Sequence, residues 1–136
     1  MVDFRILWFC HPQFMDLCNH INQCAIRMGT TFHRAEIDMS SYEGVRCWEA
    51  NHKGKNHTLR AQELADWISK QHNLFGTKTV TKNAKSSDFK NRQGLVFFID
   101  GWGATDHIDL WNGTEMAAGY PNYFSKAKEV WFWDLP

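Results

Sequence analysis

The spacing of apolar residues changes once along this 136-residue chain, and that change constrains the fold more than any other feature. In the first half, apolar residues recur at steps of three and four, as on one face of an α-helix. In the last third they form short continuous or alternating runs, which are typical of β-strands. This order predicts an α+β fold in which N-terminal helices pack on an antiparallel sheet.

Two helices are predicted in the first half. The first begins near Asn22, a favoured N-cap residue, and extends for about 14 residues. Its apolar face is formed by Ile21, Ala25, Met28, Phe32 and Ala35. Thr58 is the predicted cap of the second helix, and Trp67 flanks its apolar stripe. That stripe consists of Ala61, Leu64, Ala65 and Ile68.

Three strands are predicted in the last third. Leu95–Ile99 is a continuous apolar run, so we expect a strand covered on both faces. His107–Trp111 alternates between polar and apolar residues, and Asn112-Gly113 after it is typical of a hairpin turn. Val130–Trp133 is the third apolar strand. The segment 76–93, rich in Lys, Ser, Thr and Asn, is predicted to be a long loop or a weak hairpin.

Composition limits the classes of protein to which the chain can belong. Hydrophobic residues make up 43% of it, which is enough for a core, and its length predicts one domain spanning residues 1–136. The formal net charge of +0 argues against nucleic acid or an anionic membrane as the main partner. No apolar run is long enough to span a bilayer, and the first residues do not resemble a secretory signal. We therefore expect synthesis in the cytoplasm and no membrane insertion.

The four cysteines are interpreted first as separate thiols. Soft ligands lie near one another in the sequence at Cys10-His11, at Cys18 with His20, and at Cys47 with His52 and His57. The paired C-x-x-C spacing of structural zinc sites is absent, so neither a metal nor a cofactor is predicted. A Cys10–Cys18 or Cys18–Cys47 disulfide, formed in an oxidising compartment, is the alternative.

Cys24 is the cysteine that falls in the first turn of a predicted helix. Free amides and the helix dipole stabilise a thiolate there, and a histidine that accepts the thiol proton completes a nucleophile–base pair. His107 is the best of the seven histidines, because it opens a strand after a glycine-containing loop. Asp109 lies on the same strand face and would orient the imidazole. The alternative is that Cys24 only packs in the core and Asp109 faces solvent.

Three segments carry a family resemblance: 22–29 (Asn-Gln-Cys-Ala-Ile-Arg-Met-Gly), 57–65 and 107–113. Together they closely resemble the type VI secretion amidase effectors of family 4, from Leu7-Trp8 to Val130–Trp133. The resemblance implies a papain-like, NlpC-type fold and a Cys-His mechanism with Cys24 and His107. It also implies cleavage of the bond between γ-D-glutamate and meso-diaminopimelate in peptidoglycan stem peptides.

The sequence departs from the family pattern at the third catalytic position. NlpC-type enzymes usually take the orienting residue from the strand after the histidine strand, which corresponds here to residues 118–120, Ala-Gly-Tyr. None of these side chains orients an imidazole well. Asp109 is therefore predicted to act instead, with Asn112 and Glu115 as alternatives.

Substrate contacts are less constrained by the sequence. Backbone amides in the first turn of the Cys24 helix are the predicted oxyanion donors. Trp102 and Trp111 flank His107, where they either line the cleft or belong to the core. Arg27 and Arg60 are interpreted as surface or packing residues rather than as ligands of a substrate carboxylate.

The effector resemblance also implies partners. A type VI secretion apparatus would deliver the enzyme into the periplasm of a neighbouring bacterium, and a cognate immunity protein would block the active site. Two other functions stay open at this point. One is a degenerate binding module with the same fold, and the other is a papain-like hydrolase that acts on a different amide.

Overall fold

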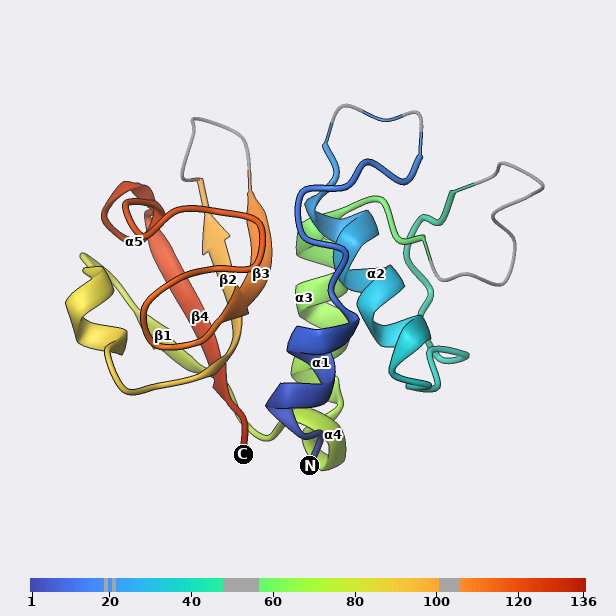
Figure 1. Cartoon of the computed structure of the whole chain (residues 1–136), viewed down its shortest axis with the longest axis horizontal. Helices are drawn as coiled ribbons and strands as arrows, with labels where there is room; N and C mark the ends of the chain where they lie inside the picture. Colours follow the sequence, from blue (N-terminus) through green and yellow to red (C-terminus); the bar gives the residue numbers. More distant parts are fainter. Residues whose placement is uncertain (19, 21, 48–56, 101–105) are drawn as a thin grey trace.

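The structure is a computed structural model that describes residues 1–18, 20, 22–47, 57–100 and 106–136. Four of the five described α-helices precede the strands, in agreement with the predicted order (Figure 1). The helices are α1 (Phe4–Cys10), α2 (Cys24–Arg34), α3 (Ala61–Lys70), α4 (His72–Phe75) and the short α5 (Tyr123–Lys126). The strands are β1 (Thr79–Thr81), β2 (Gly94–Ile99), β3 (His107–Trp111) and β4 (Glu129–Asp134), and a 3-10 turn, η2, spans Ser86–Phe89.

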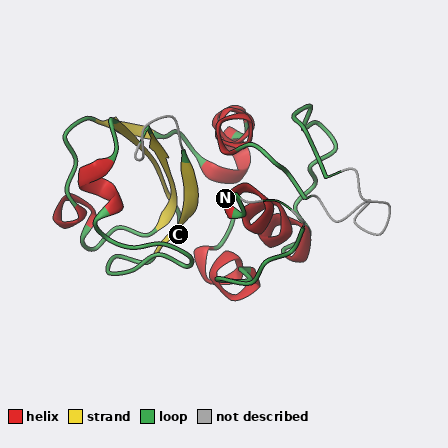
Figure 2. Ribbon diagram, turned by 90° about the horizontal axis from the view of Figure 1, so that it is seen from above, coloured by secondary structure: helices red, strands yellow, loops and turns green. Residues whose placement is uncertain are grey.

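The four strands form one antiparallel sheet in the order β1-β4-β2-β3. β2 lies inside the sheet, where Phe98 is opposite His107 of β3 on one side and Val130 of β4 on the other. From Gly94 to Phe98 the strand is buried, so the prediction of a strand covered on both faces is confirmed. The helices α1 to α4 lie on one side of the sheet, whereas α5 and η2 lie beyond its other face (Figures 1 and 2).

The segment 76–93 is more ordered than the sequence pattern indicates. β1 pairs with β4, with Thr79 opposite Phe132, and η2 follows. The prediction of a loop or weak hairpin is therefore wrong for this part of the chain. A three-residue edge strand carries too few residues for a recognisable period, and its partner is distant in the sequence.

The predicted helices are present, but both start later than expected. α2 begins at Cys24, and the Asn22 side chain accepts a hydrogen bond from the Cys24 amide at 3.4 Å. Thr58 does not cap α3, which begins at Ala61. The Thr58 hydroxyl instead donates to the carbonyl of Ala25 at 2.7 Å, so it ties the approach to α3 to the first turn of α2.

Two apolar clusters form the core, one on each face of the sheet. Ile108 and Leu110 point to the helical side, whereas Trp111 packs against Phe124 on the other side, which confirms the predicted alternation of β3. Trp111 is 1% exposed and donates its ring N–H to the carbonyl of Phe89 at 3.0 Å. It is a core residue, so the interpretation as a cleft-lining residue is wrong.

α1 was not predicted, because seven residues give too little periodicity. Asp3 caps it by accepting from the Arg5 amide at 2.8 Å, and Leu7 is fully buried against the helical core. α1 packs along α2, which in turn packs on β3 (Figure 1). Within the described part of the chain, no helix is both long and apolar enough to cross a membrane.

Candidate functional site

Cys24 is the first residue of α2 and is 4% exposed. Its thiol lies 3.2 Å from Oδ1 of Asn22, which accepts a hydrogen bond from it, and 4.0 Å from the carbonyl of Asp106 just before β3. The first-turn amides of a helix have no partner within the helix, and the helix dipole is positive at this end. This position favours the thiolate form of a cysteine.

Gln23 fixes the loop that leads to Cys24. The Gln23 side-chain amide donates to the carbonyls of Cys18 and His20, at 2.9 and 2.6 Å. Its oxygen accepts from the amide of Leu17 at 3.0 Å. Because Gln23 is buried, these bonds hold the approaching chain rigidly against the start of α2.

His107 is the first residue of β3, and its Nε2 lies 2.7 Å from Oδ2 of Asp109. Burial lowers the pKa of His107, but hydrogen bonds to Asp109 and Cys24, with attraction to their charges, outweigh burial and raise the pKa to about 10. The imidazolium form is therefore favoured at neutral pH. The packing of α2 on β3 brings Cys24 within hydrogen-bonding reach of this ring.

Asp109 is fully buried, and its carboxylate is surrounded by donors. Besides His107, the amide of Leu110 donates to Oδ1 at 2.8 Å, and the amide of Ala118 lies 3.2 Å from both oxygens. A buried carboxylate needs such partners, because an unpaired buried charge is costly. The bonds also fix the carboxylate in one orientation toward the imidazole.

The segment 118–120, where the family pattern places the orienting residue, packs against this pair. An added Cβ at Gly119 would lie 3.1 Å from both Oδ2 of Asp109 and Nε2 of His107. Because Gly119 has no side chain, the carboxylate of Asp109 can occupy the space beside His107. Of the two alternatives, Asn112 uses its side-chain oxygen to cap its own turn, and Glu115 is exposed.

His11, at the end of α1, also belongs to the site. Its Nδ1 accepts from the amide of Gln13 at 2.8 Å, so the ring proton is on Nε2, which lies 3.8 Å from Oδ1 of Asp109. Burial lowers the pKa of His11 to about 4, although the charge of Asp109 opposes this. His11 is thus neutral at pH 7, and its contact with Asp109 is not an ion pair.

Tyr123 of α5 completes the surroundings of His107. The two ring centroids are 5.0 Å apart and the rings meet edge to face. Sequence reasoning missed both Tyr123 and His11 as site residues. No spacing in the sequence signals either one, because each reaches the site through the packing of a short helix.

The other residues considered for substrate contact do not join this site in the described part of the chain. The Arg27 guanidinium donates to the carbonyls of Phe14 and Met15, at 2.9 and 3.0 Å, which supports its interpretation as a packing residue. Arg60 is on the surface, 3.8 Å from Glu63. Trp102, with the glycine-containing loop around it, lies outside the described residues.

A second group of thiols and imidazole lies upstream of α3. Sγ of Cys18 is 3.3 Å from Sγ of Cys47 and 2.9 Å from Nδ1 of His57. The three atoms all lie within 4.8 Å of one another. Cys18 and Cys47 are therefore adjacent, but no disulfide joins them, which agrees with their interpretation as separate thiols. His52, named with Cys47 as a soft ligand, lies outside the described residues.

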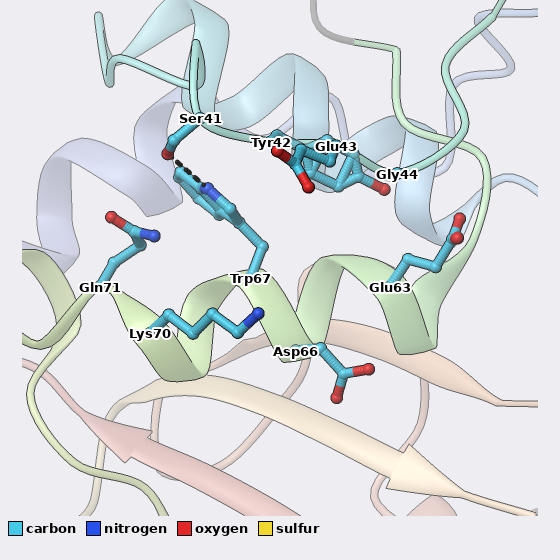
Figure 3. A pocket seen from close by; sticks show the side chains of 9 residues that line it. All are labelled: Ser41, Tyr42, Glu43, Gly44, Glu63, Asp66, Trp67, Lys70 and Gln71. Atoms are coloured by element: carbon cyan, nitrogen blue, oxygen red, sulfur yellow. Dashed lines mark hydrogen bonds between the residues drawn. The ribbon is translucent and has the colours of Figure 1, made fainter.

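A pocket of ≈ 460 Å³ lies between α3 and the segment 41–44, away from both groups (Figure 3). The ring N–H of Trp67 donates to Oγ of Ser41 across it, at 3.0 Å. Its lining consists of Ser41, Tyr42, Glu43, Gly44, Glu63, Asp66, Trp67, Lys70 and Gln71. None of the residues around Cys24 or Cys18 contributes to it.

The fold resembles solved structures over the whole chain. The Tae4–Tai4 effector–immunity complex of Salmonella Typhimurium matches with a TM-score of 0.75 and 19% identity, covering 100% of this chain and 99% of that chain. The corresponding complex of Enterobacter cloacae matches with a TM-score of 0.70 and 20% identity, over 100% and 99%. Tae4 of Enterobacter cloacae matches with a TM-score of 0.61 and 22% identity, over 85% and 73%. These matches confirm the predicted α+β, papain-like architecture.

Sequence comparison identifies the family. No curated protein sequence matches the chain. A model of the family described as type VI secretion system (T6SS), amidase effector protein 4, matches residues 20–133. This range includes α2 and reaches into β4, so it contains Cys24, His107 and Asp109. The chain therefore belongs to the Tae4 family of type VI secretion amidase effectors.

Proposed function

We propose that residues 1–136 form one amidase domain that cleaves the γ-D-glutamyl–meso-diaminopimelate bond of peptidoglycan stem peptides. Cys24 is the nucleophile, His107 the base and Asp109 the orienting residue. The observation that carries this proposal is the hydrogen-bonded series from Cys24 through His107 to the buried carboxylate of Asp109. Membership of an amidase effector family supports the reaction class.

Formation of the acyl-enzyme follows from the charges in this series. Attack requires that the thiol proton of Cys24 passes to His107, and the raised pKa of His107 favours this transfer. The thiolate attacks the carbonyl carbon of γ-D-glutamate, and first-turn amides of α2 stabilise the resulting oxyanion. When the C–N bond breaks, His107 gives its proton to the departing amine of diaminopimelate. The glutamyl group is left as a thioester on Cys24.

Hydrolysis reverses the direction of proton transfer. The now neutral His107 accepts a proton from water, and the hydroxide attacks the thioester carbonyl. The C–S bond breaks, which restores the thiolate beside the imidazolium and releases the product acid, whose proton passes to solvent. Since Nε2 of His107 is bonded to Asp109, Nδ1 is the nitrogen that exchanges protons with Cys24 and with water.

Cys18 also contacts an imidazole, that of His57. Two features favour Cys24 as the nucleophile. Cys24 starts a helix, whereas Cys18 lies in a loop and contacts a second thiol, that of Cys47. Moreover, the imidazole near Cys24 is held by a carboxylate, which supports an imidazolium during catalysis.

The relatives solved as complexes carry an immunity protein, Tai4, and we propose a cognate immunity protein for this chain as well. It would cover the Cys24 site and protect the producing cell. Delivery by a type VI secretion apparatus would bring the enzyme to the periplasm of a neighbouring bacterium, where peptidoglycan is accessible.

Digestion of purified sacculi followed by mass spectrometry of the muropeptides tests this function. The wild-type protein should split tetrapeptide stems between the second and third residues, and Cys24→Ala should not. Cys10→Ala is the matched control, because Cys10 is outside both groups and should keep the wild-type activity. An unchanged muropeptide profile after treatment with the wild-type protein would overturn the proposal.

A further inference from the structure

We propose that Cys18, Cys47 and His57 bind a zinc ion that ties the loop before Cys24 to the segment before α3. The three donor atoms already converge, since all lie within 4.8 Å of one another. Two thiolates and one imidazole are a set that zinc prefers. This site is separate from the proposed amidase chemistry and does not depend on it.

The distances fit a metal better than a disulfide. Zinc–sulfur bonds of about 2.3 Å and zinc–nitrogen bonds of about 2.0 Å, at tetrahedral angles, separate two sulfurs by about 3.8 Å and sulfur from nitrogen by about 3.5 Å. The observed separations are 3.3 Å between Cys18 and Cys47 and 2.9 Å between Cys18 and His57. Each pair needs to open by only about half an ångström to admit the ion. A disulfide requires the sulfurs to close to about 2.05 Å and gives His57 no role.

The backbone positions two of the ligands without the ion. The amide of Cys47 donates to the carbonyl of His57 at 2.7 Å, and the amide of Leu59 donates to the carbonyl of Val45 at 3.0 Å. These bonds hold the two strands of chain side by side, so Cys47 and His57 face the same space. Both residues are buried, at 7% and 6% exposed, which limits exchange of a bound ion with solvent.

Binding balances charge at the site. A zinc ion displaces the thiol protons of Cys18 and Cys47, and both protons pass to solvent. Neutral His57 supplies the lone pair of Nδ1, so two thiolates neutralise the charge of the ion. A water molecule completes the four-coordinate shell. No electron is transferred, because zinc has no redox chemistry under these conditions.

The proposed ion would stabilise the start of α2 from two sides. Gln23 bonds to the carbonyl of Cys18 and so links this ligand to the residue before Cys24. Thr58, next to His57, donates to the carbonyl of Ala25. Without the ion, these two segments are held together near Cys24 by fewer bonds, and the thermal midpoint of unfolding should fall.

Metal analysis of the purified wild-type protein by mass spectrometry is the first test. We expect one zinc ion per chain in the wild type and in the control Cys10→Ser, and a loss of at least tenfold in Cys18→Ser and Cys47→Ser. Thiols counted after denaturation with a chelator should number four, as in the sequence. Absence of metal with only two free thiols would establish a disulfide and overturn the proposal.

A second test does not depend on variants that could fail to fold. Apoprotein prepared from the wild type is titrated with cobalt(II), and sulfur-to-cobalt charge transfer is followed in the near ultraviolet. Saturation at one equivalent, reversal by zinc and a higher thermal midpoint with zinc are expected. If the fully reduced, folded apoprotein binds neither cobalt nor zinc, the three side chains form only a hydrogen-bonded cluster and the proposal is wrong.

Discussion

The molecule contains two groups in which a thiol meets an imidazole, and they differ in the third member. Around Cys24, the imidazole of His107 is bonded to the buried carboxylate of Asp109. Around Cys18, which contacts His57, the third member is the thiol of Cys47. A carboxylate keeps an imidazole charged and ready to carry protons, whereas a second thiol makes a soft ligand set. The third member therefore decides between proton transfer and metal binding.

The two groups also differ in how the fold assembles them. Cys24 and His107 come from the helical and the sheet parts, and they meet because α2 packs on β3. Cys18 and His57 both precede α3 and meet through loops held by backbone hydrogen bonds. Predictions about the first group therefore concern turnover and the charge on His107, and those about the second concern metal and thiol content.

The largest expected effect comes from changing the third member of the first group. Asp109→Asn keeps the size of the side chain but removes its charge, so turnover should fall by roughly 10³- to 10⁴-fold. Kinetic assays on a soluble stem peptide, run well below the thermal midpoint, would measure this. Circular dichroism serves as the folding control. If Asp109→Asn kept turnover within tenfold of the wild type, the carboxylate would not distinguish the first group from the second, and the proposed mechanism would be wrong.

Thiol reactivity should separate the groups next. At pH 7, Cys24 is expected to react with iodoacetamide on the order of 10²-fold faster than Cys10, because its thiolate is stabilised by the helix start and by His107. Cys18 and Cys47 should stay slow until a chelator removes the ion. Peptide mass spectrometry after timed labelling would report each site. Equal rates at Cys24 and Cys10 would contradict an activated nucleophile.

The sequence predicts the long elements of this fold well and the short ones poorly. α2 and the strands β2 to β4 carry enough apolar residues for their periods to be recognised. β1 and η2 have three and four residues, and their positions follow from packing rather than from a local pattern. Thr58 illustrates the same limit, because its hydroxyl makes a tertiary bond in place of the predicted cap.

The candidate site shows a similar division. Cys24, His107 and Asp109 could be named from the sequence, because helix position, strand alternation and family resemblance all bear on them. His11 could not, since it reaches Asp109 only through the packing of α1. The group at Cys18 was found only in part: the sequence offers Cys18 and Cys47 as a possible disulfide, but the 29 residues between them give no sign that both converge on His57.

The raised pKa of His107 predicts a pH dependence of stability. The pKa of His107 is near 6.5 in the unfolded chain and about 10 in the folded protein, so folding favours the protonated imidazole. The resulting stabilisation is complete below pH 6.5 and is lost as the pH rises toward 10, on the order of a few kcal/mol. Urea unfolding of the wild type and His107→Gln between pH 6 and 10 measures it. If the free energy of unfolding depended on pH in the same way for both proteins, the His107 imidazole would not be the group that stabilises the fold by its charge.

His11 should produce a smaller effect with the opposite sign. Burial lowers its pKa to about 4, while the unfolded value stays near 6.5, so folding favours the neutral ring. The stabilisation is complete above pH 6.5 and is lost as the pH falls toward 4, about 3 kcal/mol in all. His11→Gln should flatten this acid limb of the urea unfolding curve and leave the alkaline limb set by His107 in place. If His11→Gln shifted the alkaline limb as well, the two histidines would titrate as one unit around Asp109, and the first group would have four members instead of three.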